Sequence, residues 1–218
     1  MNEKILINAR IVDPSQKLDE MGSVIIDKNG KVKAIGKKVT KKDCPNAEVI
    51  DVKKNLIIPG IVDMKAFVGE PGFEYKENFR TLSQAALAGG VTSIVTMPNT
   101  KPIIDNVSMV DFIMRRGRDK SKINLFPCAS LTKQMEGKLM TEFGLLSAKG
   151  IIGFSDVNKT VQNTETMARI MDYASDIGVL IMQHAEDYEL SKNRCINEGE
   201  VSNSCLLYTS PSPRDLVI

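Results

Sequence analysis

LIIPGIVDMKAFVGEPG, residues 56–72, is the stretch from which the fold of this chain can be inferred. Two short apolar runs, 56–58 and 61–64, are separated by Pro59-Gly60, and a second turn signal, Glu70-Pro71-Gly72, follows them. A short apolar run bounded by Gly and Pro predicts a buried strand. Strands that are buried on both faces are typical of parallel sheets covered by helices.

Upstream of this stretch the sequence predicts a small all-β unit. Short β-rich runs occupy residues 4–12, 23–27, 31–36 and 48–52. The middle two flank Lys28-Asn29-Gly30, and Asn-Gly between two such runs predicts a hairpin. We therefore assign residues 1–57 to a separate N-terminal β segment.

Downstream the pattern alternates between strand and helix. After the strand near residue 61, further strands are expected at 91–97, 123–129, 151–155 and 179–183, and helices at 76–88, 105–118, 137–149 and 164–177. Asp105 and Asn163 are the expected N-caps of the second and fourth helices. Five βα steps in succession predict a parallel sheet with right-handed crossovers. The spacing alone fits a (β/α)8 barrel or a doubly wound sheet.

Composition indicates a globular chain. The chain has 218 residues, a net charge of +2 and 42% hydrophobic residues. No apolar run approaches the roughly 18 residues of a spanning helix, and the N-terminus has no signal-peptide pattern, so we expect a cytoplasmic location. The near-balanced charge gives no reason to expect nucleic acid or membrane as a partner. The four scattered cysteines are expected to be free, buried thiols.

Several short motifs together resemble the dihydroorotases of the amidohydrolase superfamily. These motifs are PGIVDM, EPG, AGGVTS, MPNT, GFSD, QHAED and NEGEVS. The resemblance favours the barrel over the doubly wound sheet, and it implies that residues 1–57 form part of a β-sandwich beside the barrel. The expected fold is therefore α/β, with a partial TIM (β/α)8 barrel of about five βα units at residues 58–203.

The resemblance ends near residue 203. The family continues with three more strands, another metal-binding His and a catalytic Asp, so we expect a chain truncated at its C-terminal side. Residues 204–218, SCLLYTSPSPRDLVI, have no period and resemble the translation of a sequencing adapter. We predict that this segment is a non-native tail.

The family's zinc ligands are replaced on the first strand. The resemblance places two zinc-binding histidines at positions 65 and 67 and a substrate-binding Arg at 69, where this chain has Lys65, Phe67 and Gly69. A protonated lysine has no lone pair to offer a metal, and Phe has no ligand atom. The loss of the Arg removes a bidentate clamp for a carboxylate. The Lys65 ammonium either takes the place of the zinc charge or simply reaches solvent.

The later strands keep only part of the family pattern. Val157 stands where metal-binding members have a ligating Asp, while Asp156 matches the preceding Asp and either enters the site or bonds loop backbone. His184, the one histidine, matches a metal-ligand position, but a His at a strand end can also be purely structural. Asn99 matches the family's substrate-contacting Asn and also suits a turn after a strand.

These replacements lead to a main hypothesis and two alternatives. The first is a non-catalytic dihydroorotase-like protein of pyrimidine biosynthesis that needs no cofactor, although the family uses zinc, and that serves as a structural partner of aspartate carbamoyltransferase. The second is an active zinc-dependent cyclic amidohydrolase that interconverts carbamoyl aspartate and dihydroorotate or opens a hydantoin or allantoin ring. The third is a fragment with open sheet edges and no stable function.

Overall fold

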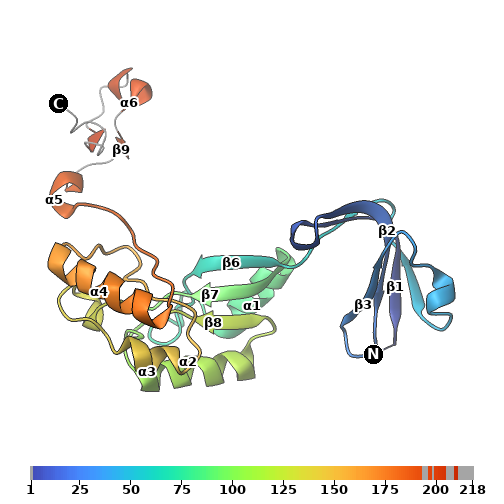
Figure 1. Ribbon diagram of the computed structural model, residues 1–218, viewed down its shortest axis with the longest axis horizontal. Helices are drawn as coiled ribbons and strands as arrows, with labels where there is room; N and C mark the ends of the chain where they lie inside the picture. Colours follow the sequence, from blue (N-terminus) through green and yellow to red (C-terminus); the bar gives the residue numbers. More distant parts are fainter. Residues whose placement is uncertain (1, 193–195, 198, 205–208, 211–218) are drawn as a thin grey trace. The chain divides into compact units, whose positions relative to one another are not determined.

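A computed structural model describes residues 2–192, 196–197, 199–204 and 209–210 of the chain (Figure 1). The chain divides into two compact units, Met1–Gly60 and Ile61–Ile218. Each unit has its own buried hydrophobic clusters.

The first unit is a five-stranded sheet with the order β3-β2-β1-β4, in which β5 also pairs with β1. Its strands are β1 (Lys4–Asp13), β2 (Leu18–Ile26), β3 (Val32–Gly36), β4 (Glu48–Asp51) and β5 (Leu56–Ile57). The predicted hairpin between β2 and β3 is confirmed, since the Asp27 amide donates to the Lys31 carbonyl at 2.8 Å. Gly30 supplies the turn with a φ of 79°, a region that glycine adopts without a steric penalty.

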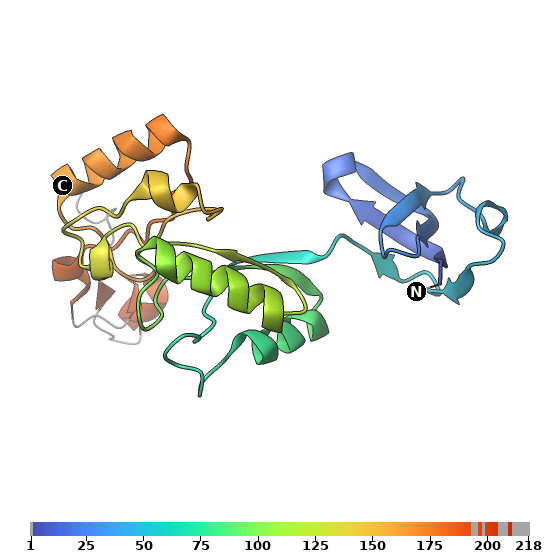
Figure 2. The ribbon, with the colours of Figure 1, turned by 90° about the horizontal axis from the view of Figure 1, so that it is seen from below.

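The second unit is built on three parallel strands, β6 (Ile61–Ala66), β7 (Val91–Thr96) and β8 (Asn124–Pro127), which lie side by side in Figure 1. Helix α1 (Phe79–Ala88) packs on β7 and helix α2 (Val107–Lys120) packs on β8; Figure 2 shows α2 alongside the sheet. Strand, helix and strand therefore alternate as the sequence predicts.

The fourth and fifth predicted strands are reduced to single parallel bridges. Ala129 pairs with Phe154, and Phe154 pairs with Ile181. The backbone bonds continue for a few residues, since Phe154 donates to the Leu180 carbonyl and Met182 donates to the Phe154 carbonyl, both at 2.9 Å. Pro127 has no amide hydrogen to extend the pairing. The parallel order nevertheless runs from β6 through β8 to residues 154 and 181.

The helix predicted at residues 164–177 is confirmed in full. Helix α4 (Thr164–Ile177) begins after Asn163, whose side chain accepts from the Thr166 amide at 2.8 Å. Gly178 ends it with a left-handed φ of 67°.

Two other helix predictions are wrong in part. The N-cap of α2 is Asn106, which accepts from the Met109 amide, while Asp105 is buried and accepts two hydrogen bonds from Gln134. The helix expected at 137–149 shortens to α3 (Phe143–Ser147). The residues before it form a loop, because the Thr141 hydroxyl donates to the Ser130 carbonyl at 2.7 Å. The remaining short elements are α5 (Tyr188–Ser191), α6 (Glu200–Ser204), β9 (Ile196–Asn197), β10 (Thr209–Ser210) and the 3-10 helices Pro14–Gln16, Lys41–Asp43 and Lys133–Met135.

The main interior of the second unit lies between the strands and the helices. Phe143 and Phe154 stack with ring centroids 3.9 Å apart, and both are fully buried. They share a cluster with side chains of α1, α2 and α4, including Phe79, Ile113 and Ile170. Cys44 and Cys128 are free, buried thiols, as expected; Cys195 and Cys205 lie outside the described residues.

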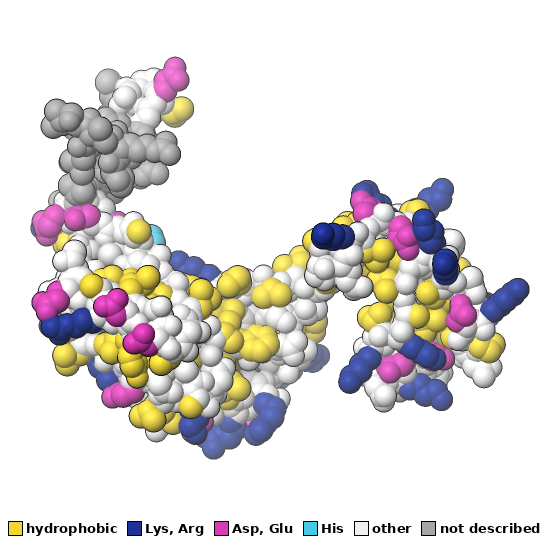
Figure 3. All heavy atoms as spheres, viewed as in Figure 1, with side chains coloured by type: hydrophobic (Ala, Val, Ile, Leu, Met, Phe, Trp, Pro, Cys, Tyr) yellow, Lys and Arg dark blue, Asp and Glu magenta, His cyan; other side chains and the backbone are white. Residues whose placement is uncertain are grey.

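The prediction of a buried strand at residues 61–64 is wrong. Ile61, Val62 and Met64 are 46%, 57% and 51% exposed. Within the described residues, β6 pairs with β7 alone, so its other edge and much of its surface remain uncovered. Hydrophobic side chains gather over this sheet on the face in Figure 3.

No helix formed by the described residues has the length and apolar character required to cross a bilayer. The predicted non-native tail is largely outside the described residues, which include only Ser204, Thr209 and Ser210 of residues 204–218. That prediction therefore stays untested.

The turn after β6 is anchored by a buried carboxylate. Glu70 is 4% exposed and accepts from Arg116 Nε at 2.8 Å and from the Phe79 amide at 3.2 Å. A second guanidinium nitrogen, Arg116 Nη2, lies 2.6 Å from the same carboxylate oxygen. One side chain therefore connects the loop after β6, the start of α1 and the middle of α2.

Glu70→Ala is expected to lower the free energy of unfolding by about 2 to 3 kcal/mol, because a buried charge-assisted pair is broken and a helix amide loses its acceptor. The loss stays below that of a fully buried pair because the Arg116 side chain is 40% exposed and can be hydrated. Urea titration followed by circular dichroism measures it. Glu165→Ala is the control, since its pair with Arg169 is exposed. Equal small losses in both variants would contradict the anchoring role.

Candidate functional site

The predicted site residues follow the carboxyl ends of the parallel strands. Lys65 is the second-to-last residue of strand β6, and Asn99 follows β7. Asp156 and His184 follow the bridged segments at 154 and 181. Loops at this edge of a parallel sheet are where ligand sites of such folds are found. The chain topology thus places these four positions on one edge of the sheet.

Positions 65 and 67 carry side chains that are committed to other contacts. Lys65 is exposed, and its Nζ lies 3.5 Å from Asn158 Oδ1, so the ammonium reaches the loop that follows residue 154. Phe67 is 36% exposed and packs at 6.0 Å, between ring centroids, against Phe73. This edge therefore presents a cation and an aromatic ring.

Gly69 occupies a conformation that excludes a side chain. Its φ is 73°, and a Cβ built there would lie 2.5 Å from the Glu77 carbonyl oxygen and 2.9 Å from that of Phe73. The Phe73 amide also donates to the Gly69 carbonyl at 2.6 Å, which closes the loop over this position. The backbone around residue 69 is therefore packed in a way that leaves no space for an arginine side chain.

Val157 is buried in an apolar cluster. It is 7% exposed and packs with Val95, Met97, Cys128 and Met135. Its φ of 58° is unusual for a β-branched residue, which crowds its own backbone in the left-handed region. This position therefore combines backbone strain with a side chain that has no ligand atom.

Asp156 is buried and bonds the neighbouring loop. Its Oδ1 accepts from the amides of Leu131 and Thr132 at 2.8 and 3.1 Å, and its Oδ2 accepts from the Thr132 hydroxyl at 2.5 Å. Burial raises the pKa of this carboxyl above its ordinary value, while the bonds from Thr132 and Leu131 act in the opposite direction. The sequence left two roles open for Asp156, and in the structure its side chain bonds loop backbone rather than entering the site.

His184 is half-exposed and pairs with a neighbouring carboxylate. Its Nε2 lies 2.9 Å from Glu186 Oε2, and its carbonyl accepts from the Thr160 hydroxyl at 2.5 Å. Hydrogen bonds from Ser191 and His184 hold the pKa of Glu186 below its ordinary value. The ring is thereby oriented by contacts within its own loop and the loop after residue 154.

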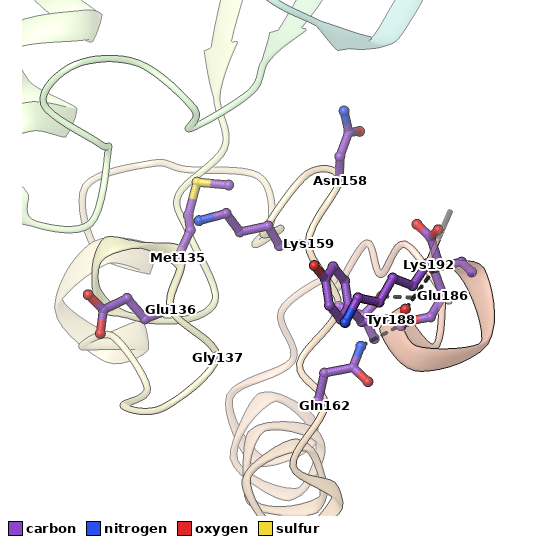
Figure 4. Close-up of a pocket in the computed structure, with 11 residues that line it drawn as sticks. Met135, Glu136, Gly137, Asn158, Lys159, Gln162, Glu186, Tyr188 and Lys192 are labelled. Carbon is purple, nitrogen blue, oxygen red and sulfur yellow. Dashed lines mark hydrogen bonds between the residues drawn. The ribbon is translucent and has the colours of Figure 1, made fainter. Parts of the chain in front are cut away.

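A cavity of about 610 Å³ opens beside this pair. In Figure 4, Lys159 extends toward Met135 on one side, while Tyr188, Lys192 and Gln162 lie together on the other. The lining side chains are mostly polar or charged: Met135, Glu136, Gly137, Asn158, Lys159, Thr160, Gln162, Glu186, Tyr188, Ser191 and Lys192. The charges of two lysines and two glutamates balance among the lining residues.

A second, smaller cavity of about 310 Å³ contains Asn99. The Oδ1 atom of Asn99 is buried and has no hydrogen-bond partner among the residues that the structure describes. Lys159 and Met135 line both cavities, so the two spaces adjoin at these side chains. The remaining lining residues are Phe73, Thr100, Lys101, Pro102, Ile103 and Gln134.

The donor set does not fit a catalytic zinc ion. Such an ion takes three protein ligands from His, Cys, Asp or Glu. Within the described parts of the chain, no group of three such side chains could hold a metal. Lys65, Phe67 and Val157 present an ammonium, an aromatic ring and an isopropyl group, so we derive no step that passes through a metal.

Sequence reasoning missed several residues that shape this site. Thr132 holds Asp156, Phe73 packs on Phe67, and Lys101 and Lys159 line the smaller cavity. Lys101 directly follows the MPNT motif, and Lys159 lies three positions after Asp156. Their positions close to the motifs were the one sequence feature that could have pointed to them. Only the fold brings residues 101 and 159 to one cavity.

Solved structures of other proteins share the fold of this chain. An L-hydantoinase (dihydropyrimidinase) from Arthrobacter aurescens matches with a TM-score of 0.73 and 20% identity, over 87% of this chain and 42% of that one. A crystal structure of a dihydroorotase matches with a TM-score of 0.59 and 13% identity, over 86% and 52%. At these identities the likeness concerns the fold alone.

The sequence comparisons identify the family. The family model described as Dihydro-orotase-like matches residues 54–212. The dihydroorotase of Syntrophus aciditrophicus (strain SB) is 40% identical over 200 residues, which are 91% of this chain and 46% of that protein. That of Aquifex aeolicus (strain VF5) is 37% identical, over 93% and 47%. The chain belongs to the dihydroorotase-like family, and it spans about half the length of these curated relatives.

Asp156→Asn is expected to gain stability relative to the natural chain as the pH rises. Because the pKa of Asp156 is raised on folding, the unfolded chain loses this proton at lower pH. The contribution of Asp156 to stability therefore falls from the ordinary carboxyl range, about pH 4, upward through the raised pKa. Asparagine keeps an acceptor for the two amides and does not ionise. Urea titrations across this pH range measure the difference.

Glu142→Gln is expected to show the opposite pH dependence of stability. The hydrogen bond from Lys133 lowers the pKa of Glu142, so its stabilising contribution is present above the ordinary value and is lost as the pH falls through the lowered one. The variant should therefore lose stability relative to the natural chain as the pH rises. For Asp156→Asn, a difference in the free energy of unfolding from the natural chain that stays constant with pH would show that burial does not raise the pKa of Asp156.

Proposed function

We propose that this chain is a dihydroorotase-like protein of pyrimidine biosynthesis that has lost zinc-dependent hydrolysis and acts as a structural partner of aspartate carbamoyltransferase. Membership of the dihydroorotase-like family supports the assignment to pyrimidine biosynthesis. The side chains at the family's ligand positions support the loss of hydrolysis. The partner is an inference from the resemblance to non-catalytic members of the family.

The described part of the second unit is, in this proposal, the first five βα steps of a (β/α)8 barrel. The parallel order from β6 to residue 181 supports this, as does the coverage of about half of each relative. The half-exposed apolar side chains of β6 would then be covered in a longer protein, since a closed barrel leaves no strand edge.

Gly69 is the observation on which the loss of hydrolysis rests. Replacement of a ligand could be a local change, but the backbone here has closed over the place of the substrate arginine. On the same loop Phe67 packs on Phe73, and across the sheet Val157 completes an apolar cluster. These contacts support the proposal, because the side chains at these positions pack with one another and offer no ligand to a metal.

The unchanged protein is expected to bind no stoichiometric zinc and to show no turnover of dihydroorotate. The physical reason is that its ligand positions offer an ammonium, a ring and an isopropyl group. Metal analysis after dialysis and a spectrophotometric assay measure the two quantities. Lys65→His/Phe67→His/Val157→Asp, which restores three donor groups beside His184, is the matched comparison and should raise zinc uptake. Turnover by the unchanged protein that chelator abolishes would instead support the active zinc amidohydrolase.

The protein is expected to co-purify with the aspartate carbamoyltransferase of its own source. Affinity-tagged protein and untagged carbamoyltransferase, co-expressed, should elute together from a sizing column at a mass above either alone. The paired control is the same experiment with an unrelated barrel enzyme. Separate elution at micromolar concentration would refute the partnership while leaving the loss of hydrolysis intact.

A further inference from the structure

The smaller cavity has a positive lining without an opposing charge. Lys101 comes from the loop after β7 and Lys159 from the loop after residue 154, and no Asp or Glu is among the lining residues. Within the described parts of the chain, neither lysine forms a salt bridge. The buried carboxylate of Asp156 interacts electrostatically with Lys159 but forms no salt bridge with it, and it already accepts three hydrogen bonds. Two lysines therefore line the cavity without a salt bridge from the described residues.

The charge favours a ligand with two negative charges. Two lysines paired with one carboxylate would leave a positive charge uncompensated in a partly enclosed space. A phosphate monoester carries about −1.5 to −2 at neutral pH and matches the pair. Lysine binds phosphate as a point charge, whereas carboxylate recognition favours the planar fork of arginine, and no arginine lines this cavity.

The rest of the lining suits a flat ring. Phe73 forms one wall, Ile103 and Met135 add apolar surface, and the cavity volume of about 310 Å³ is at the lower end of ligand pockets. Lys76 lies over the Phe73 ring with its Nζ 5.4 Å from the centroid.

We propose that the cavity between Phe73, Lys101 and Lys159 binds a small phosphate monoester that carries a planar ring. The phosphate lies between the two lysines and the ring lies against Phe73. This inference goes beyond the proposed function, and its test requires neither zinc nor a partner protein. The phosphate site and the proposed function can therefore fail independently.

Isothermal titration of the intact protein with three probes tests the charge and the ring separately. Phenyl phosphate carries both features, inorganic phosphate carries the charge alone, and benzoate carries the ring with a single charge. Phenyl phosphate is expected to bind at least tenfold more tightly than either of the other two. Equal affinity for benzoate and phenyl phosphate would overturn the dianion argument, and the absence of binding by folded protein would overturn the site.

Variants locate the site. Lys101→Met and Lys159→Met should each weaken phenyl phosphate binding at least tenfold, while Phe73→Leu should reduce its affinity to that of inorganic phosphate. Lys120→Met removes an exposed lysine at the end of α2 and should leave binding unchanged. Thermal melting of every variant verifies folding, and Lys159→Gln replaces Lys159→Met if the latter unfolds. An equal loss in Lys120→Met would show non-specific charge attraction and refute the assignment.

Discussion

The buried carboxylate of Asp156 is the constraint on which the candidate site depends. It accepts hydrogen bonds from the Leu131 amide and from the Thr132 amide and hydroxyl, and it thereby connects the loops that follow two neighbouring parallel segments. Burial of a charge is costly, and these three bonds offset only part of that cost, since the pKa of Asp156 remains raised. With this connection made, Val157 turns into the apolar cluster and Lys159 lies between the two cavities. A single acidic residue therefore organises the loops around the candidate site.

The edge of the sheet that bears this site presents cations, amides and aromatic rings. Lys65 reaches Asn158, Phe67 packs on Phe73, and Gly69 permits a tight loop that no larger residue could form. His184 keeps a family position, but its ring is paired with Glu186. These contacts are mutually consistent, because each replaced side chain has acquired a neighbour suited to its chemistry. A framework held by Glu70 and Asp156 can thus persist while the groups at its edge change.

Local signals in the sequence were reliable where one side chain satisfies nearby backbone. Asn163 and Gly178 bound α4 at the predicted residues, and Asn29-Gly30 forms the predicted hairpin turn. The same logic failed at Asp105, because Asn106 beside it is an equally good cap and Asp105 is used by Gln134 of a distant loop. The expected helix at 137–149 failed similarly, since Thr141 bonds the Ser130 carbonyl and holds the first half of the segment as a loop. In both cases a long-range hydrogen bond decided between local conformations of similar free energy.

The sequence by itself determined the alternation of strands and helices, the family, and the chemistry of the side chains at positions 65, 67 and 157. Residue chemistry suffices for these, because Phe and Val lack donor atoms in any fold. Only the tertiary structure decided that Gly69 is enclosed by the carbonyls of Phe73 and Glu77, and that Lys101 and Lys159 share one cavity. It also decided that β6 is exposed, which its apolar sequence does not indicate. The reason is that burial and proximity depend on how the chain folds back and which segments pack together, and the local sequence pattern does not record these contacts.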